Sequence, residues 1–291
     1  MKRAIGAFLF AAAALAGAGS SAEAATKIVL IAGRPSHGPG EHEFNAGTKL
    51  LVECLKHVEG IEPVFVAGGW PEDESVFEGA KSVVFFMDGG SNHPMVQGKR
   101  METMRGLMDR GVGLVCLHYA VEFPKGPEAG DRLLDWLGGY YETGYSLNPH
   151  NDIVVTPKPD HPITRGVEKP FRANDEWYFR IRFRPDDPRV TPILTGENFV
   201  GRDGQKYPER QTLAWATERK DGGRGFGFTG AHNHTNWGIP EFRTLVLNAI
   251  LWSAKLEVPS NGVQCSVSDD DLKKNLDPKV RRDQSQKAKA K

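Results

Sequence analysis

Nine histidines are the side chains of this chain best suited to chemistry near neutral pH. An imidazole can accept a proton, donate a proton or bind a metal ion in this pH range. Most of these histidines follow short apolar runs: His37 and His42 after 27–32, His93 after 82–87, His118 after 113–117, and His232 and His234 after 225–229. Ligands of an open parallel α/β sheet bind outside the carboxyl ends of its strands. The placement therefore predicts one polar, histidine-rich site assembled from several loops.

His118, at the end of a central strand, is the candidate for the central acid or base. Tyr119 lies beside it, and Glu122 could hold the tautomer of the imidazole. Glu176 could enter the same cleft as a second acid or base, or as a metal ligand. Two structural alternatives stay open: His118 could order its turn through a loop carbonyl, and Glu176 could pair with an arginine of the run 180–184.

Further polar and aromatic side chains near predicted loops are candidates for binding a substrate. Exposed aromatic faces stack on sugar rings, although core packing is the simpler interpretation for any single aromatic residue. The candidate substrate-binding residues are His37, His42, Glu43, Asp88, His93, His150, Trp177, His232 and Trp237.

A divalent metal ion could be a cofactor, because imidazoles are common ligands of transition metals. The candidate ligands are His37, His42, His118, His232 and His234. The step from His232 to His234 places both rings on one face only if the segment is extended. An H-E-x-x-H motif is lacking, so a zinc assignment is weak. The loop after 82–87 also lacks the nucleotide-binding patterns, so we expect no nucleotide cofactor.

The elements that must position these residues alternate between strand and helix in the first half of the chain. Strands are predicted at 27–32, 64–66, 82–87 and 113–117, and helices at 45–58, 95–110 and 130–137. The alternation is typical of a parallel sheet with helices on its faces. The second half has predicted strands at 153–156, 177–184, 190–194, 212–217 and 225–229, an exposed loop at 196–210, and an amphipathic helix at 240–254.

The amino-acid sequence at the two ends of the chain differs from that of this predicted core. Residues 1–24 have the charged start, the alanine-rich apolar stretch and the A-x-A ending of a secretory signal peptide. We expect cleavage after Ala24, a periplasmic or secreted mature protein, and no stable membrane insertion. From Val258 onward the chain is expected to leave the core, with a short helix starting at Ser268 and a basic, disordered tail at 279–291.

Composition excludes some classes of partner. The chain of 291 residues carries no net charge at pH 7, so it offers no electrostatic basis for binding nucleic acid. Its apolar fraction of 39% suffices for one large domain. Three cysteines without close spacing argue against a disulfide framework. Cys54 and Cys116 are interpreted as buried apolar residues.

Several motifs of the chain resemble those of the trehalose-utilisation, or ThuA-like, family. They are Ser36-His37-Gly38 with His42-Glu43, Asp88-Gly89-Gly90 with His93-Pro94, Leu117-His118-Tyr119-Ala120, Asp160-His161-Pro162, Asp175-Glu176-Trp177-Tyr178, and the stretch from Gly223 to Trp252. The resemblance spans about residues 27–255 in order, which leaves 256–291 as a C-terminal extension. It implies a flavodoxin-like α/β sandwich, similar to class I glutamine amidotransferases, with a mostly parallel central sheet. It also implies a link to sugars, in particular 3-keto glucosides.

The chain departs from the amidotransferases at their nucleophile. Those enzymes place a cysteine at the sharp turn after the central strand. Here Cys116 lies inside the predicted strand, and His118 occupies the turn. A buried thiol is ordinarily inert, so we do not expect a cysteine-dependent amidotransferase.

The expected function is acid–base conversion of a glycoside or an oxidised sugar by an isomerase, lyase or hydrolase, with or without a metal ion. A nicotinamide-binding motif is not visible in the sequence, so any oxidation would belong to a partner sugar oxidoreductase. Two alternatives stay open: a non-catalytic sugar-binding or scaffold module, and a metal-dependent hydrolase of another bond type.

Overall fold

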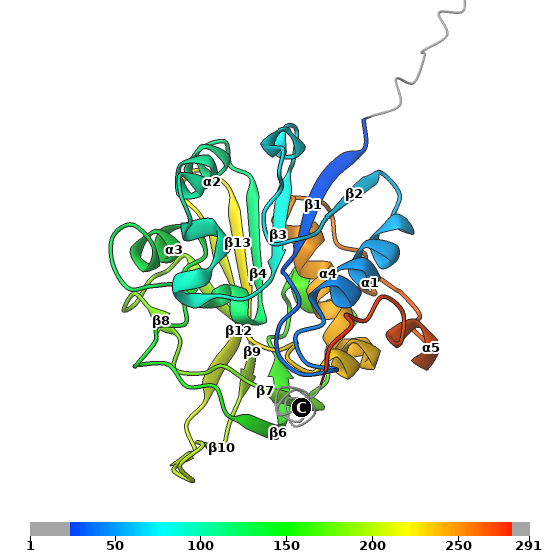
Figure 1. Cartoon of the computed structure of the whole chain (residues 1–291). Coiled ribbons are helices and arrows are strands. Elements are labelled where there is room, and N and C mark those ends of the chain that lie inside the picture. Colours follow the sequence, from blue (N-terminus) through cyan, green and yellow to red (C-terminus); the bar gives the residue numbers. More distant parts are fainter. Residues whose placement is uncertain (1–23, 281–291) are drawn as a thin grey trace, which may run out of the picture.

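The computed structural model describes residues 24–280 and has a large sheet with helices on both faces (Figure 1). The predicted signal peptide, 1–24, lies outside the described residues apart from its last position. Within the described range, no helix is both long and apolar enough to cross a membrane.

Five parallel strands form the centre of the sheet. In spatial order they are β2 (Ile61–Val66), β1 (Thr26–Ala32), β3 (Ser82–Phe86), β4 (Gly113–Leu117) and β13 (Arg224–Phe228). Every residue of β3 and β4 is buried. This burial on both faces of the sheet explains why the sequences of both strands are continuous apolar runs.

Helices cover the two faces of this parallel part. One face carries α1 (Phe44–Lys56) and α4 (Pro240–Ser253), and the other carries α2 (Arg100–Asp109) and α3 (Gly130–Trp136). Alternate residues of β1 point to opposite cores, so Ile28 and Leu30 join the first and Val29 and Ile31 join the second.

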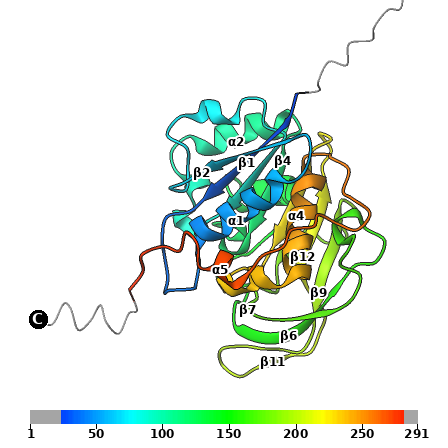
Figure 2. The same cartoon turned by 90° about the vertical axis from the view of Figure 1, so that its right-hand side faces the viewer.

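The sheet continues as an antiparallel part beyond β13. Its strands are β12 (Gln211–Glu218), β9 (Val190–Gly196), β6 (His150–Pro157) and β7 (Phe171–Glu176). In both views β6 and β7 lie below the carboxyl ends of the parallel strands (Figures 1 and 2). The end of β7 therefore approaches the loops that follow β1, β4 and β13.

Short elements complete the described chain. They are the strands β5 (Gly139–Tyr140), β8 (Arg182–Phe183), β10 (Phe199–Val200) and β11 (Lys206–Tyr207), the helix α5 (Asp269–Leu272), and the 3₁₀ turns η1 (Glu74–Phe77), η2 (Gly90–Asn92), η3 (Pro94–Val96), η4 (His118–Val121), η5 (Pro162–Thr164) and η6 (His234–Gly238). The predicted capping start of α5 is confirmed, because Ser268 and Asp271 form a capping box.

Three predicted elements were wrong in part. The strand expected at 177–184 is reduced to β8, because a bend precedes it in which Trp177 and Tyr178 are both buried and Arg180 has φ +54°. The loop expected at 196–210 contains the hairpin β10–β11, because Phe199 is buried and stacks on Phe179. The helix expected at 95–110 is divided, since Gly98 has φ +57° between η3 and α2.

The segment after α4 does not leave the core as predicted. Val258 and Val263 are buried among the apolar residues that α4 contacts. Asn248 of α4 accepts the backbone N–H of Val263 at 2.8 Å. Cys265 forms a disulfide with Cys54 on α1, which corrects the expectation of unpaired cysteines. A pairing across 211 positions leaves no spacing signal in the sequence.

The disulfide should contribute measurably to stability. Cys54→Ser should lower the free energy of unfolding by about 2–4 kcal/mol, because the bond closes a long loop in the unfolded chain. Denaturant unfolding of Cys54→Ser, Cys265→Ser and the double variant measures this effect. The double variant should lose no more than either single variant, whereas additive losses would contradict the bond.

Candidate active site: a histidine and carboxylate cluster

The predicted histidine site forms at the carboxyl ends of the parallel strands. His118 directly follows β4, His42 lies in the loop after β1, and His232 lies in the loop after β13. Glu176 is the last residue of β7 and comes from the antiparallel part of the sheet. All four side chains are buried. Three loops and one edge strand thus bring one polar cluster together.

The four side chains present donor atoms to a common centre. His42 Nε2 lies 3.0 Å from His118 Nε2 and 2.9 Å from His232 Nδ1. Glu176 Oε2 lies 3.3 Å from His232 Nδ1 and 3.8 Å from His118 Nε2. One donor atom of each residue lies within 4.8 Å of every other, which defines the histidine and carboxylate cluster.

Hydrogen bonds on the far side of two rings determine which nitrogens carry protons. His118 Nδ1–H donates to the carbonyl of Thr229 at 2.9 Å. His42 Nδ1–H donates to Asp88 Oδ1 at 3.2 Å. In the neutral rings, Nε2 of both residues is therefore an unprotonated acceptor. Two lone pairs face each other across 3.0 Å, and the hydroxyl of Tyr178 lies 3.4 Å from His118 Nε2. A cation or a shared proton between the two nitrogens would relieve the repulsion of the lone pairs.

The electrostatics of the cluster favour neutral imidazoles and an ionised carboxylate. Burial lowers the pKa of His42 and of His118, and neighbouring imidazoles lower both further. Burial alone would raise the pKa of Glu176, but His232, His118 and Arg202 together lower it to about 2. The shared-proton arrangement is thus disfavoured near pH 7, and a cation fits better.

The donor set fits a divalent transition metal. Imidazole nitrogens and a carboxylate oxygen are ligands of zinc and related ions, and the outer hydrogen bonds from His42 and His118 are those that ligating histidines normally make. Donors around a tetrahedral ion with bonds of about 2.0–2.2 Å lie roughly 3.3 Å apart. The distances of 2.9, 3.0, 3.3 and 3.8 Å in the cluster scatter around this value.

Strained backbone holds the ligand loops. His42 has φ +46°, His118 has φ +53°, and Ala231, just before His232, has φ +90°. Such conformations cost about 1–3 kcal/mol each and concentrate at functional sites. A strained turn therefore follows β4, with His118 in the strained position and Cys116 buried inside the strand, as the sequence predicted.

Backbone contacts and a buried carboxylate support the same loops. The N–H of His42 donates to the carbonyl of His232 at 3.0 Å. Asp175 accepts the N–H groups of Ala231 at 2.6 Å and Asn233 at 3.0 Å. Sequence reasoning missed this role of Asp175, although its place before Glu176 in a family motif was a usable signal.

Glu176 pairs with an arginine, but not with one from the run 180–184. Arg202, near the hairpin β10–β11, donates to Glu176 Oε1 at 2.7 Å. This contact leaves Glu176 Oε2 for the histidines. The structural alternative considered for Glu176 therefore accounts for only one of its two oxygens.

Tyr119 and Glu122 lie beside the cluster. Burial and the charges of Glu122, Asp88 and Glu176 raise the pKa of Tyr119 to about 12, so its hydroxyl keeps its proton. Burial also raises the pKa of Glu122, whose Oε1 accepts a hydrogen bond from Thr143 at 2.7 Å. The predicted role of Glu122 as the tautomer holder of His118 is wrong, because the carbonyl of Thr229 has that role.

Two glycines in the loop after β3, Gly89 and Gly90, hold Tyr119 and Glu122 in place. The N–H of Gly90 donates to the carbonyl of Glu122 at 2.9 Å. A Cβ atom on Gly89 would lie 2.1 Å from the carbonyl oxygen of Tyr119, so only glycine permits this approach.

Two further predicted histidines lie near the cluster. The ring centroid of His37 is 3.6 Å from that of His42, and its Nδ1 is 3.8 Å from Asp88 Oδ1. His150 is exposed on β6, with its ring centroid 4.8 Å from that of His232. Asp88 accepts a hydrogen bond from Ser36 and is about one-third exposed. These residues form the rim of the site.

Five residues that were predicted to belong to the site stabilise the fold instead. Trp177 and Trp237 are fully buried and pack against Phe242. Buried His93 accepts the N–H of Met95 and lies against Phe123. Buried Glu43 and His234 contact the C-terminal segment through Asp277 and Leu272 respectively. His234 does not join His232 in the cluster, because it begins the turn η6 and its Nε2–H donates to the carbonyl of Leu272.

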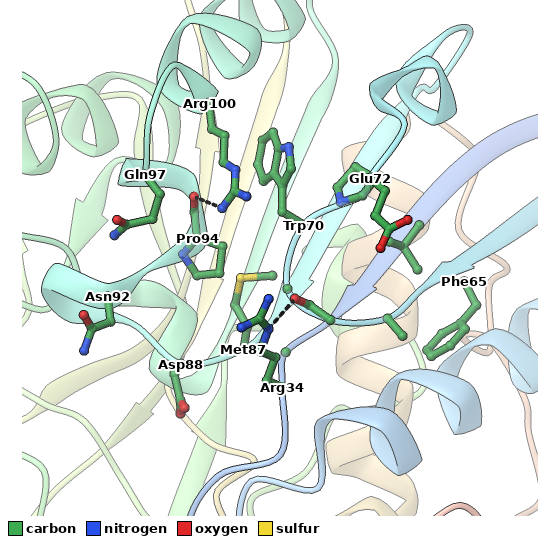
Figure 3. Close-up of a pocket in the computed structure, with 16 residues that line it drawn as sticks. Arg34, Phe65, Trp70, Glu72, Met87, Asp88, Asn92, Pro94, Gln97 and Arg100 are labelled. Atoms are coloured by element: carbon green, nitrogen blue, oxygen red, sulfur yellow. Dashed lines mark hydrogen bonds between the residues drawn. The ribbon is translucent and has the colours of Figure 1, made fainter.

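A cavity of about 650 Å³ lies at the carboxyl ends of β1, β2 and β3, next to the cluster (Figure 3). Asp88 lines the cavity and also holds His42, so it links the two. Figure 3 shows Arg34, Asn92, Gln97 and Arg100 around the same space. Sequence reasoning missed all four, since none of them stands in a motif. The volume is within the range of pockets that bind small molecules.

Comparisons with known proteins agree with this fold. A family model described as trehalose utilisation matches residues 40–253. A ThuA-like protein from Bacteroides uniformis matches with a TM-score of 0.55 and 16% identity, covering 81% of this chain and 94% of that protein. A ThuA-like protein from Parabacteroides merdae matches with a TM-score of 0.57 and 18% identity, covering 84% and 94%.

A glutamine amidotransferase from Thermotoga maritima matches with a TM-score of 0.43 and 11% identity, covering 80% of this chain and 97% of that protein. No curated protein sequence matches this chain. The structures of the two ThuA-like proteins confirm the predicted α/β sandwich with its large, mostly parallel central sheet.

Proposed function

Because this chain belongs to the trehalose-utilisation (ThuA) family, we propose that it is an exported enzyme that converts a glycoside or a 3-keto sugar by metal-assisted acid–base chemistry. Membership of the family suggests a carbohydrate-related role. The observation that carries the proposal is the close approach of the Nε2 atoms of His42 and His118, 3.0 Å apart, in one buried group with Glu176 and His232.

His42, His118, His232 and Glu176 are the residues that would hold the metal ion. A bound divalent ion supplies Lewis acidity, which polarises a carbonyl group of the substrate. Asp88 and the carbonyl of Thr229 orient the rings of His42 and His118 from behind. These outer contacts keep the ligand nitrogens deprotonated and aimed at the centre.

Glu122 and Tyr119 would then carry the proton transfers. The raised pKa of Glu122 makes its carboxylate a stronger base than an ordinary glutamate. The raised pKa of Tyr119 keeps its hydroxyl protonated, so it can donate a hydrogen bond to a developing oxyanion. This assignment moves the acid–base role from His118 and Glu176 to residues that the cluster does not use.

A keto group acidifies the C–H bond on the neighbouring carbon. Glu122 would take that proton, and the electrons of the C–H bond would move to the keto oxygen to form an enolate. Return of a proton to carbon completes an isomerisation. Loss of the aglycone oxygen from the next carbon, with a proton added to that oxygen, completes an elimination. Neither route changes the number of electrons, so the chemistry needs no redox cofactor.

The keto sugar would come from a separate reaction. A secondary alcohol becomes a ketone only by oxidation, which we assign to a partner sugar oxidoreductase. The Cys54–Cys265 disulfide supports the proposed export to the periplasm or beyond, because such bonds persist in oxidising compartments.

A test of the proposal is the turnover of a 3-keto glucoside followed by proton NMR. The keto sugar should be consumed at least about 100-fold faster than its parent glucoside, because only the keto form has an acidic C–H bond. Dialysis against a chelator should abolish turnover, and Zn²⁺, Mn²⁺ or Co²⁺ should restore it.

Other outcomes would identify the alternatives. Sugar binding without turnover would indicate a non-catalytic module. Metal-dependent cleavage of an ester or amide, with all sugars inert, would indicate a hydrolase of another bond type. Either result would contradict the proposed function.

A further inference from the structure

The C-terminal segment from Cys265 to Lys279 lies across the loops that carry His42 and His232. The disulfide joins its first residue to α1. The carbonyl of Leu272 accepts a hydrogen bond from His234 Nε2 at 3.0 Å. The side chain of Asp277 accepts a hydrogen bond from Asn45 at 2.8 Å. The segment thus contacts the start of α1, the loop before it and the turn after His232.

Lys279 makes the contacts nearest to the cluster. Its side chain is only 4% exposed. The ammonium group donates to the backbone carbonyls of Glu41 and His42, the latter at 3.0 Å, and lies 3.3 Å from Glu43 Oε1. A buried ammonium is stable only where its charge and its three N–H donors are matched, and these partners match them.

Glu43 completes a connection between the loop and the segment. Its carboxylate accepts the N–H of Gly40 at 2.9 Å and the N–H of Asp277 at 2.8 Å. The residue was expected to bind substrate. Its side chain is instead 1% exposed and joins the His42 loop to Lys279 and Asp277.

We propose that residues 265–279 form a strap that positions His42, and that Lys279 is the positioning residue of this strap. His42 has φ +46°, a conformation that non-glycine residues keep only where surrounding contacts enforce it. Lys279 holds the carbonyl groups on both sides of the His42 backbone N–H. The charges that face it are those of Glu43 and Asp277.

The strap matters because His42 is the central member of the cluster. Its Nε2 atom is the one that lies within 3.0 Å of both His118 and His232. Ligands must be held to within about 0.5 Å for a productive site. The consequence for metal binding rests on the proposed function, whereas the position of the His42 ring does not.

The first experiment compares Lys279→Met with the matched control Lys273→Met in metal-free protein labelled with ¹⁵N-histidine. Lys273 lies on the same segment, and its ion pair among residues 24–280 is with exposed Asp270. The ring signals of His42, assigned from a His42→Gln spectrum, should move or split in Lys279→Met and stay unchanged in Lys273→Met. Lys279→Arg should return them toward the wild-type positions. Lys279→Gln, which keeps two N–H donors, serves if the methionine variant does not fold.

The second experiment measures the affinity for Co²⁺ and the visible spectrum of the Co²⁺ protein. Lys279→Met should weaken Co²⁺ binding about 10-fold to 100-fold and alter the spectrum, with rescue by Lys279→Arg. Unchanged His42 signals in a folded Lys279 variant would overturn the strap. Absence of Co²⁺ binding by the wild type would overturn the proposed function alone, because the NMR result would still decide the strap.

Discussion

His118→Gln should lose stoichiometric metal binding and should lower turnover of a keto sugar by at least about 10³-fold, the effect of removing several kcal/mol of Lewis-acid stabilisation. The amide oxygen of glutamine is a weaker transition-metal ligand than the imidazole Nε2 that faces His42, and the substitution leaves the carbonyl of Thr229 without its donor. Metal analysis and NMR turnover assays on the same preparation measure both effects.

His57→Gln is the control for this prediction, because His57 is exposed at the end of α1. It should keep both metal and activity. A His118→Gln protein that folds and retains a full equivalent of metal would show that the four side chains do not form the binding site.

Glu122→Gln should lower turnover by about 10²–10⁴-fold, the usual contribution of a general base, while the metal content stays at the wild-type level. The base acts only when deprotonated, so turnover should fall as the pH drops through the raised pKa of Glu122. This acid limb should lie at higher pH than for an ordinary glutamate. It should be missing in Glu122→Gln. Rates measured from about pH 4 to about pH 9 test this expectation.

Thr143→Val gives a second test of Glu122 as the general base. The hydroxyl of Thr143 donates to Glu122 Oε1 and lowers the pKa of that carboxyl against the effect of burial. Removing the donor should move the acid limb to higher pH without changing metal content. If the limb stays in place in Thr143→Val, and Glu122→Gln retains activity, the base is another residue.

The sequence was sufficient to predict the parallel half of the sheet and the ends of its strands. The apolar runs before His42 and His118 identify strands buried on both faces, and polar residues after such strands must meet at one edge. His118 at the turn and Cys116 inside β4 follow from counting positions along one strand. These features can be predicted because each depends on a pattern of only a few neighbouring residues.

The failures concern contacts between distant segments. The alternation around Trp177 is typical of a strand with one buried face, but with the bend at Arg180 both Trp177 and Tyr178 are buried. Cys54 and Cys265 pair because the chain after α4 returns over α1. The basic composition around Lys279 predicts a solvated tail, yet this amine is buried against Glu43. In each of these three cases the local sequence is compatible with both a buried and an exposed segment, and the tertiary packing determines which of the two forms.

The most direct test is the metal content of the protein purified without a metal-affinity step, measured by elemental analysis. We expect about one equivalent of a divalent transition metal per chain at neutral pH, lost on acidification because protonated imidazoles cannot bind metal. The low pKa of His42 and His118 should delay that loss to a lower pH than at sites with ordinary histidines. A folded protein that holds less than about 0.1 equivalent, even after incubation with excess Zn²⁺, Mn²⁺, Co²⁺ and Ni²⁺, would contradict the metal site.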